Sequence, residues 1–144
     1  MLSVQPERLV VLLSVVVLVT LAVAVVRHDV RARGRQLAAA PAGPLWDALG
    51  IVADGRPTVV AFSSPSCGAC HTAQLPALVA LGEQLGHTAV RLLEVDIASQ
   101  PDVASRFGIL TVPSTVVLRS DGGVGAVNHG FTPTARLAAQ LQGS

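Results

Sequence analysis

The hydrophobic residues of this chain follow two different patterns. Between Leu9 and Val26 the chain is apolar except for Ser14 and Thr20. A helix over these residues would span roughly 27 Å, which is close to the thickness of a bilayer core. From residue 45 onward, short apolar runs alternate with polar and turn-forming segments, as they do in a globular domain. The pattern predicts one membrane-spanning helix followed by one soluble domain.

The charges that flank the apolar run favour an anchor over a cleaved signal peptide. In a signal peptide, Leu9–Leu21 would be the apolar region and Ala22–Ala24 would precede the cleavage site. Only Arg8, next to Glu7, supplies positive charge before the run, whereas four arginines follow it within residues 27–35. Positive charge directly after a span resists translocation. We therefore expect an uncleaved single-pass anchor whose C-terminal side faces the cytoplasm, with secretion or an outward-facing domain as the alternatives.

These features divide the chain into four segments. Residues 1–8 are an N-terminal flank, and residues 9–26 are the transmembrane helix. Residues 27–44 combine an arginine-rich juxtamembrane part with an Ala/Gly/Pro linker, and residues 45–144 are the globular domain. About 100 residues are enough for one hydrophobic core.

Within the globular segment, helical and strand periodicities alternate. Helices are expected at residues 45–53, 67–86, 101–107 and from 133 onward. Thr132 should cap the last helix, Gly86 should end the second, and Pro76 should kink it. Continuous apolar, β-branched runs predict buried strands at residues 58–62, 89–95 and 114–118, with a fourth strand at 124–127 after an Asp121-Gly122 turn. This order predicts an α/β fold with a central mixed sheet flanked by helices.

Charge and cysteine content exclude several classes of protein. Residues 1–44 hold five arginines against two acids, a net charge of +3, and residues 45–144 hold five arginines against seven acids, a net charge of −2. A domain without a basic patch is not a dedicated nucleic-acid binder. The two cysteines are too few for a disulfide-stapled scaffold or a four-cysteine zinc site.

The two cysteines form the motif Cys67-Gly68-Ala69-Cys70, which follows a predicted strand and opens a predicted helix. Free N–H groups at a helix start favour a thiolate at the first cysteine, and the thiolate is the nucleophile. The second thiol lies close enough to close a disulfide. The pair can therefore attack a substrate disulfide and resolve the mixed disulfide within one chain.

Three segments of the domain resemble the thioredoxin family. TVVAFSSPSCGAC at residues 58–70 is similar to the family's strand, loop and active site, and EVDI at 94–97 to the end of its next strand. FGILTVPSTVVL at 107–118 resembles the Y/F-G-I-x-x-I/V-P-T segment, whose proline is cis. The resemblance covers most of residues 45–144. It implies a thioredoxin-like three-layer fold, here in the form of a membrane-anchored bacterial protein.

The resemblance also implies roles for individual residues. Cys67 would be the attacking thiol and Cys70 the resolving thiol, with Gly68 and Ala69 completing the motif. Pro113 would be the cis-proline, and the backbone of Val112 would pair with the substrate. The redox centre would be the Cys67–Cys70 disulfide, with no bound cofactor and no metal. The partners would be protein disulfides, membrane lipid and an electron donor, either a thioredoxin reductase or a membrane protein.

The direction of exchange depends on the side of the membrane. A cytoplasmic domain would reduce protein disulfides, because that compartment is reducing. An outward-facing domain would act as an oxidase, an isomerase or a maturation reductase.

The resemblance is incomplete at the proton acceptor of the resolving thiol. Ala61 stands where the family has a buried aspartate, and Leu92 stands where it has the partner lysine. Water, His71 or Glu94 would then take the proton from Cys70. Glu94 shares strand parity with Leu92, whereas His71 is expected to be solvated at the exposed start of a helix.

The same residues are also compatible with two other kinds of site, a haem attachment site and a zinc site. Cys67–His71 also spells C-x-x-C-H, the attachment signature of c-type haem, with His71 as the axial ligand and His87 or His129 as the second. Enclosure by buried strands leaves little space for a macrocycle, so electron transfer through haem ranks below disulfide exchange. A zinc site made from these cysteines and histidines fits none of the common ligand spacings.

Overall fold

The computed structural model describes residues 6–39 and 43–143 of the 144-residue chain, which form two compact units divided between Arg35 and Gln36. Helix α1 (Pro6–Ala39) contains a stretch, Glu7–Asp29, that is long and apolar enough to cross a membrane. The side chains of this stretch are exposed rather than packed against protein. A helix that is apolar on all sides and unburied matches the pattern of a membrane span.

The helix extends further than the sequence pattern suggested. The juxtamembrane part and linker were expected at residues 27–44, but α1 continues into this segment as far as Ala39. Arginine, glutamine, leucine and alanine are favourable helix formers, and they outweigh the single glycine in this stretch. Residues 40–42 of the expected linker lie outside the described residues.

The second unit is built on a four-stranded mixed sheet. Its strands are β1 (Thr58–Ser63), β2 (Arg91–Asp96), β3 (Ser114–Leu118) and β4 (Val124–His129). The strand order is β2-β1-β3-β4, with β1 and β2 parallel and the other neighbouring pairs antiparallel. The predicted mixed sheet is therefore confirmed.

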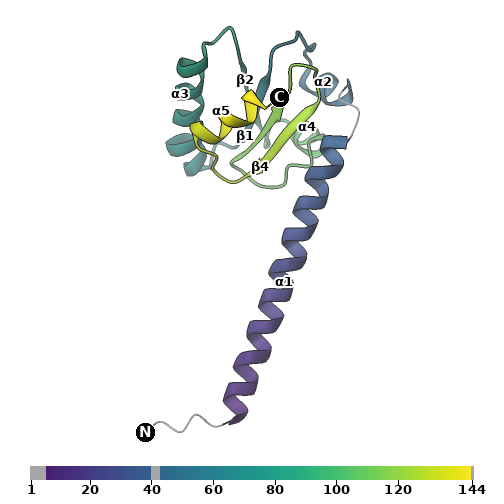
Figure 1. The fold of residues 1–144 in the computed structure, drawn as a ribbon, viewed down its shortest axis with the longest axis vertical. Helices are drawn as coiled ribbons and strands as arrows, with labels where there is room; N and C mark the ends of the chain where they lie inside the picture. The colour runs from purple at the N-terminus through teal and green to yellow at the C-terminus, as the bar shows by residue number, and fades with distance from the viewer. Residues whose placement is uncertain (1–5, 40–42, 144) are drawn as a thin grey trace. The chain divides into compact units, whose positions relative to one another are not determined.

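Helices cover both faces of the sheet and make two hydrophobic cores. Helices α2 (Gly43–Leu49) and α4 (Pro101–Arg106) contribute to one core, and α3 (Leu75–Leu85) and α5 (Thr134–Gln142) to the other. Figure 1 shows α3 and α5 close together and separate from α2 and α4. Every residue of β1 is buried because its side chains alternate between these two cores.

Two expected element positions are wrong in detail. The first helix was expected at residues 45–53, but α2 ends at Leu49 because Gly50 adopts a positive φ of 66°. The last helix was expected to have Thr132 as its cap, but Pro133 occupies that position with an extended backbone. The Thr132 side chain instead contacts the backbone of Gly130.

Strand β2 is less buried than the sequence pattern suggested. Only Val95 is fully buried, and Glu94 is exposed. The reason is the strand order, because β2 lies at the edge of the sheet and has β1 as its only neighbour among the described strands. An apolar run of this length cannot reveal from sequence whether the strand will be central or at an edge.

The helix that follows the cysteine motif is irregular. It begins at Gly68, passes through a π-helical turn (η1, Cys70–Gln74) and continues as α3. The backbone N–H of Leu75 donates to the carbonyl of Cys70, five residues earlier. Pro76 has no N–H for the normal helical ladder, and the predicted irregularity takes the form of this wider turn. Gly86, with φ of 89°, ends α3 as predicted.

Candidate active site

The cysteines lie where β1 passes into the helix. Cys67 and Cys70 form a disulfide, with their Cα atoms 5.3 Å apart. The loop is held by a hydrogen bond from the Cys67 N–H to the Ser64 carbonyl (3.0 Å). Cys67 is partly exposed and Cys70 is 4% exposed, while Gly68 and Ala69 are exposed. Of the two cysteines, Cys67 is therefore the more accessible from solvent.

The start of the helix favours negative charge on the Cys67 sulfur. The backbone N–H of Cys70 lies 3.1 Å from Cys67 Sγ and donates to it. The same N–H also donates to the Cys67 carbonyl (3.1 Å), and the His71 N–H donates to that carbonyl as well (3.4 Å), so the peptide dipoles are aligned at this point. Donors to a thiolate favour the ionised form, which is the reactive one.

The second predicted segment reaches the same end of the sheet. Strand β3 pairs with β1 so that Ser114 lies opposite Phe62, close to the beginning of the cysteine loop. The Val112–Pro113 peptide is cis, as the family resemblance implied. Val112 is half-buried and Pro113 is buried. The pairing of β1 and β3 thus brings together segments that lie far apart in the sequence.

A third segment, which sequence reasoning missed, joins the site. The buried Gln74 donates from Nε2 to the Thr132 carbonyl (3.1 Å), and its Oε1 accepts from the Thr132 N–H (2.9 Å). The Gly130 N–H donates to the Pro113 carbonyl (2.8 Å). The loop before α5 is therefore tied both to the active-site helix and to the cis-proline. In the sequence, this contact could have been suspected only from Gln74, a glutamine one turn after Cys70 on the side of the helix that is buried.

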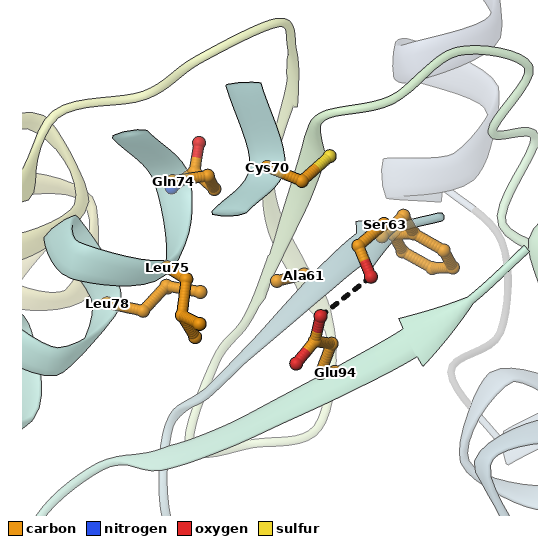
Figure 2. A pocket seen from close by; sticks show the side chains of 8 residues that line it. Ala61, Ser63, Cys70, Gln74, Leu75, Leu78 and Glu94 are labelled. Carbon is orange, nitrogen blue, oxygen red and sulfur yellow. Dashed lines mark hydrogen bonds between the residues drawn. The ribbon is translucent and has the colours of Figure 1, made fainter. Parts of the chain in front are cut away.

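A small cavity lies behind Cys70 (Figure 2). It has a volume of about 10 Å³ and is lined by Ala61, Phe62, Ser63, Cys70, Gln74, Leu75, Leu78 and Glu94. Ser63 Oγ donates a 2.7 Å hydrogen bond to Glu94 Oε1. Of the two side chains predicted as proton acceptors, Glu94 therefore lines a cavity with Cys70.

The histidines are less well placed. His71 is exposed, does not line this cavity, and uses its backbone N–H to bond the Cys67 carbonyl (3.4 Å). His87 packs against Gly82, and His129 ends β4, where partial burial lowers its pKa. In residues 6–39 and 43–143, no three His, Cys, Asp or Glu side chains are grouped as a metal site requires.

Comparison with known proteins points to one family. A family model described as thioredoxin matches residues 49–143. Oxidized mitochondrial thioredoxin 3 from Saccharomyces cerevisiae is 25% identical with a TM-score of 0.55, over 64% of this chain and 82% of that chain. Malaria parasite thioredoxin-2 (22%, TM-score 0.57, 62% and 84% covered) and chloroplastic thioredoxin z (22%, TM-score 0.56, 68% and 86% covered) are similar in fold. No curated protein matches the chain.

Proposed function

The chain belongs to the thioredoxin family, and on this premise we propose that it reduces protein disulfides through a Cys67–Cys70 dithiol–disulfide cycle. The observation that carries the proposal is the unequal exposure of the two cysteines at the start of a helix. Cys67 is partly exposed, and its sulfur accepts a backbone N–H, whereas Cys70 is buried behind it. This arrangement suits one attacking and one resolving thiol.

The proposed reaction has two exchange steps. In the reduced protein, the Cys67 thiolate attacks one sulfur of the substrate disulfide, and the other substrate sulfur leaves as a thiolate that takes a proton from water. Cys70 then loses its proton and attacks Cys67 Sγ, which releases the second substrate thiolate. The protein disulfide forms, and two electrons pass to the substrate. A dithiol donor, either a thioredoxin reductase or a membrane electron donor, returns the protein to the reduced state.

The backbone of Val112, beside cis-Pro113, is the proposed contact for an extended substrate segment. Two exposed apolar side chains support a peptide partner near this position. Leu110 is 70% exposed and precedes Val112 by two residues, and Phe131 is 51% exposed in the loop tied to Pro113. Exposed apolar side chains beside a reactive group are typical of a protein-binding surface.

We further propose that α1 anchors the domain to the membrane with the domain in the cytoplasm. The support is the asymmetry of charge, because four arginines follow the apolar run Leu9–Val26 within residues 27–35 and only Arg8 precedes it. These arginines also favour contact with anionic lipid head groups. An outward-facing domain would instead favour oxidation or isomerisation by the same two cysteines.

Reduction of a protein disulfide tests the proposed activity. The full-length protein in detergent, supplied with a dithiol, should reduce a disulfide-linked protein substrate faster than the dithiol alone. The Cys67→Ser variant should lose this acceleration. Equal rates for the wild type and Cys67→Ser would overturn the proposal.

The thiol state in living cells tests the direction of exchange. Acid-quenched cells that carry the full chain are labelled with a mass-tagged maleimide. Two tags before any reductant is added would support a reductase in the cytoplasm. If two tags appear only after reduction, the pair is kept as a disulfide, and the outward orientation replaces the inward one.

A further inference from the structure

The cavity behind Cys70 contains a carboxylate supplied by a neighbouring strand. In the β1–β2 pair, Ala61 lies directly opposite Glu94, and the small side chain of Ala61 leaves space between Glu94 and the active-site helix. Figure 2 shows Cys70 and Glu94 on the lining of the same cavity, with Ala61 between them in this view. A cavity of about 10 Å³ is close to the smallest space that holds one water molecule.

The buried position of Cys70 creates a need for a proton acceptor. Cys70 is 4% exposed, and four of the seven other residues that line the cavity are apolar: Ala61, Phe62, Leu75 and Leu78. Apolar surroundings disfavour a thiolate, yet Cys70 must lose its proton before its sulfur can attack Cys67. A base within reach through one water molecule would meet this need.

Glu94 is the residue of the lining that fits this role. The amide of Gln74 is engaged with Thr132 through both its nitrogen and its oxygen. The hydroxyl of Ser63 donates to Glu94 Oε1 and so orients the carboxylate. Glu94 is the only acid among the eight lining residues, and its residue is exposed to solvent, to which it can pass a proton.

No competing charge lines the cavity. The other titratable groups on β2 and on the helices packed against its two faces lie outside the lining: Arg91, Asp96, His71, Glu83, Asp102 and Arg106. Arg91 is paired with Asp54, and the Asp96 carboxylate accepts the Ala98 N–H (2.9 Å). Glu94 therefore has a hydroxyl partner at the cavity, which lets it gain a proton without breaking an ion pair there.

We propose that Glu94, oriented by Ser63, takes the proton of the Cys70 thiol through one water molecule while Cys70 attacks the mixed disulfide. The inference rests on the proposed exchange activity and names the group that drives its second step. The Cys70 S–H bond breaks and its proton passes to Glu94. The Cys70–Cys67 bond forms, the bond from Cys67 to the substrate breaks, and the substrate leaves as a thiolate. Glu94 then releases the proton to solvent.

The two exchange steps are separated by one turnover with an aromatic disulfide that releases two coloured thiolates in sequence. Reduced full-length protein in detergent is mixed with one equivalent of this reagent over a range of pH. The first release reports attack by Cys67, and the second reports resolution by Cys70. In Glu94→Gln, the first release should keep its rate, and the second should slow by about 100-fold at pH 7. The loss should shrink as the pH rises and hydroxide replaces the missing base.

Further variants separate a chemical role from a structural one. Ser63→Ala keeps the Glu94 carboxylate but removes its hydrogen bond, so this variant should slow the second release by a smaller factor. If Glu94→Gln does not fold, Ser63→Ala still tests the proposal. Glu83→Gln makes the same chemical change at an exposed position of α3 and should leave both releases unchanged. His71→Ala should also behave as the wild type.

Three outcomes would overturn the assignment of Glu94. The first is a second release at the wild-type rate in a folded Glu94→Gln variant. The second is a loss of rate in Glu94→Gln that is equal at every pH. The third is a slow second release in His71→Ala together with a normal one in Glu94→Gln. Absence of the first release in the wild type would instead contradict the proposed exchange activity itself.

Discussion

Gln74 and Thr132 are 58 residues apart in the sequence and are joined by two hydrogen bonds between a side-chain amide and a backbone peptide group. Both residues are buried, with 2% and 1% of their surfaces exposed. The pair fixes the loop before α5 against the turn that carries Cys70. This polar contact thus positions the loop before α5 beside the cysteine pair.

Removal of this contact should destabilise the domain. In Gln74→Met, the Thr132 N–H and carbonyl would stay buried without their partner, which costs about 2–4 kcal/mol. We expect the urea midpoint of the full chain in detergent to fall accordingly. Gln84→Met makes the same change at an exposed position of α3 and should have little effect. Equal midpoints for the two variants would contradict the role assigned to Gln74.

Removal of the resolving thiol should trap substrates. With Cys70→Ser, the mixed disulfide formed by Cys67 has no internal attacker, so it should persist. Non-reducing gels of cells that carry this variant should show protein adducts that disappear on reduction. Cys67→Ser provides the control, because the cysteine that it keeps is buried and should capture little. More adducts with Cys67→Ser than with Cys70→Ser would reverse the assigned roles.

Phe131 should contribute to the recognition of protein substrates. It is 51% exposed and lies between Gly130, which is bonded to Pro113, and Thr132, which is bonded to Gln74. Burial of part of this ring is worth up to about 2 kcal/mol, so Phe131→Ser should raise KM for a protein disulfide by up to about 30-fold.

Turnover of a small disulfide provides the internal reference for the Phe131 prediction, because such a substrate makes few contacts beyond the sulfur atoms. It should be unchanged in Phe131→Ser. Val52→Ser changes an exposed apolar residue that precedes β1, at the other end of that strand from the cysteine loop, and should leave both substrates unaffected. A parallel loss on both substrates would show that Phe131 acts on the site itself.

Asp54 should make stability depend on acid pH. The hydrogen bond from the Arg56 side chain, together with the charges of Arg56 and Arg91, lowers the pKa of Asp54 from 3.8 to about 2. A carboxylate with a lowered pKa stabilises the folded state above its unfolded value, and this stabilisation is lost as the pH falls toward the folded value. Asp54→Asn should therefore lower Tm at pH 7, and the difference from the wild type should shrink between about pH 4 and pH 2.

Asp47 offers a matched control for this pH dependence. It is an exposed acid on α2, and Asp47→Asn makes the same chemical change. Its Tm should follow that of the wild type across the same range. A difference for Asp54→Asn that stays constant down to pH 2 would show that its effect does not come from the charge.

Local features of the sequence determined much of the fold. The alternating helices and strands, the Asp121-Gly122 turn and the stop at Gly86 depend on residues close together in the chain, whose propensities and spacing can be read directly. The cysteine pair was also predictable, because the spacing within the four-residue motif is enough to place the two thiols close to each other. The cis peptide before Pro113 came from a family resemblance, since its isomer has no local signature.

Tertiary packing decided what surrounds the cysteines. The order of strands placed β2 at the edge, left Glu94 exposed and set it opposite Ala61. The Ser63–Glu94 hydrogen bond and the Gln74–Thr132 pair follow from that order and from the packing of the helices. Neighbouring residues encode secondary structure, whereas the partner of a buried polar group depends on which distant segments meet in the folded chain. The cysteine pair was therefore predictable from the sequence, and the contacts that surround it became visible only in three dimensions.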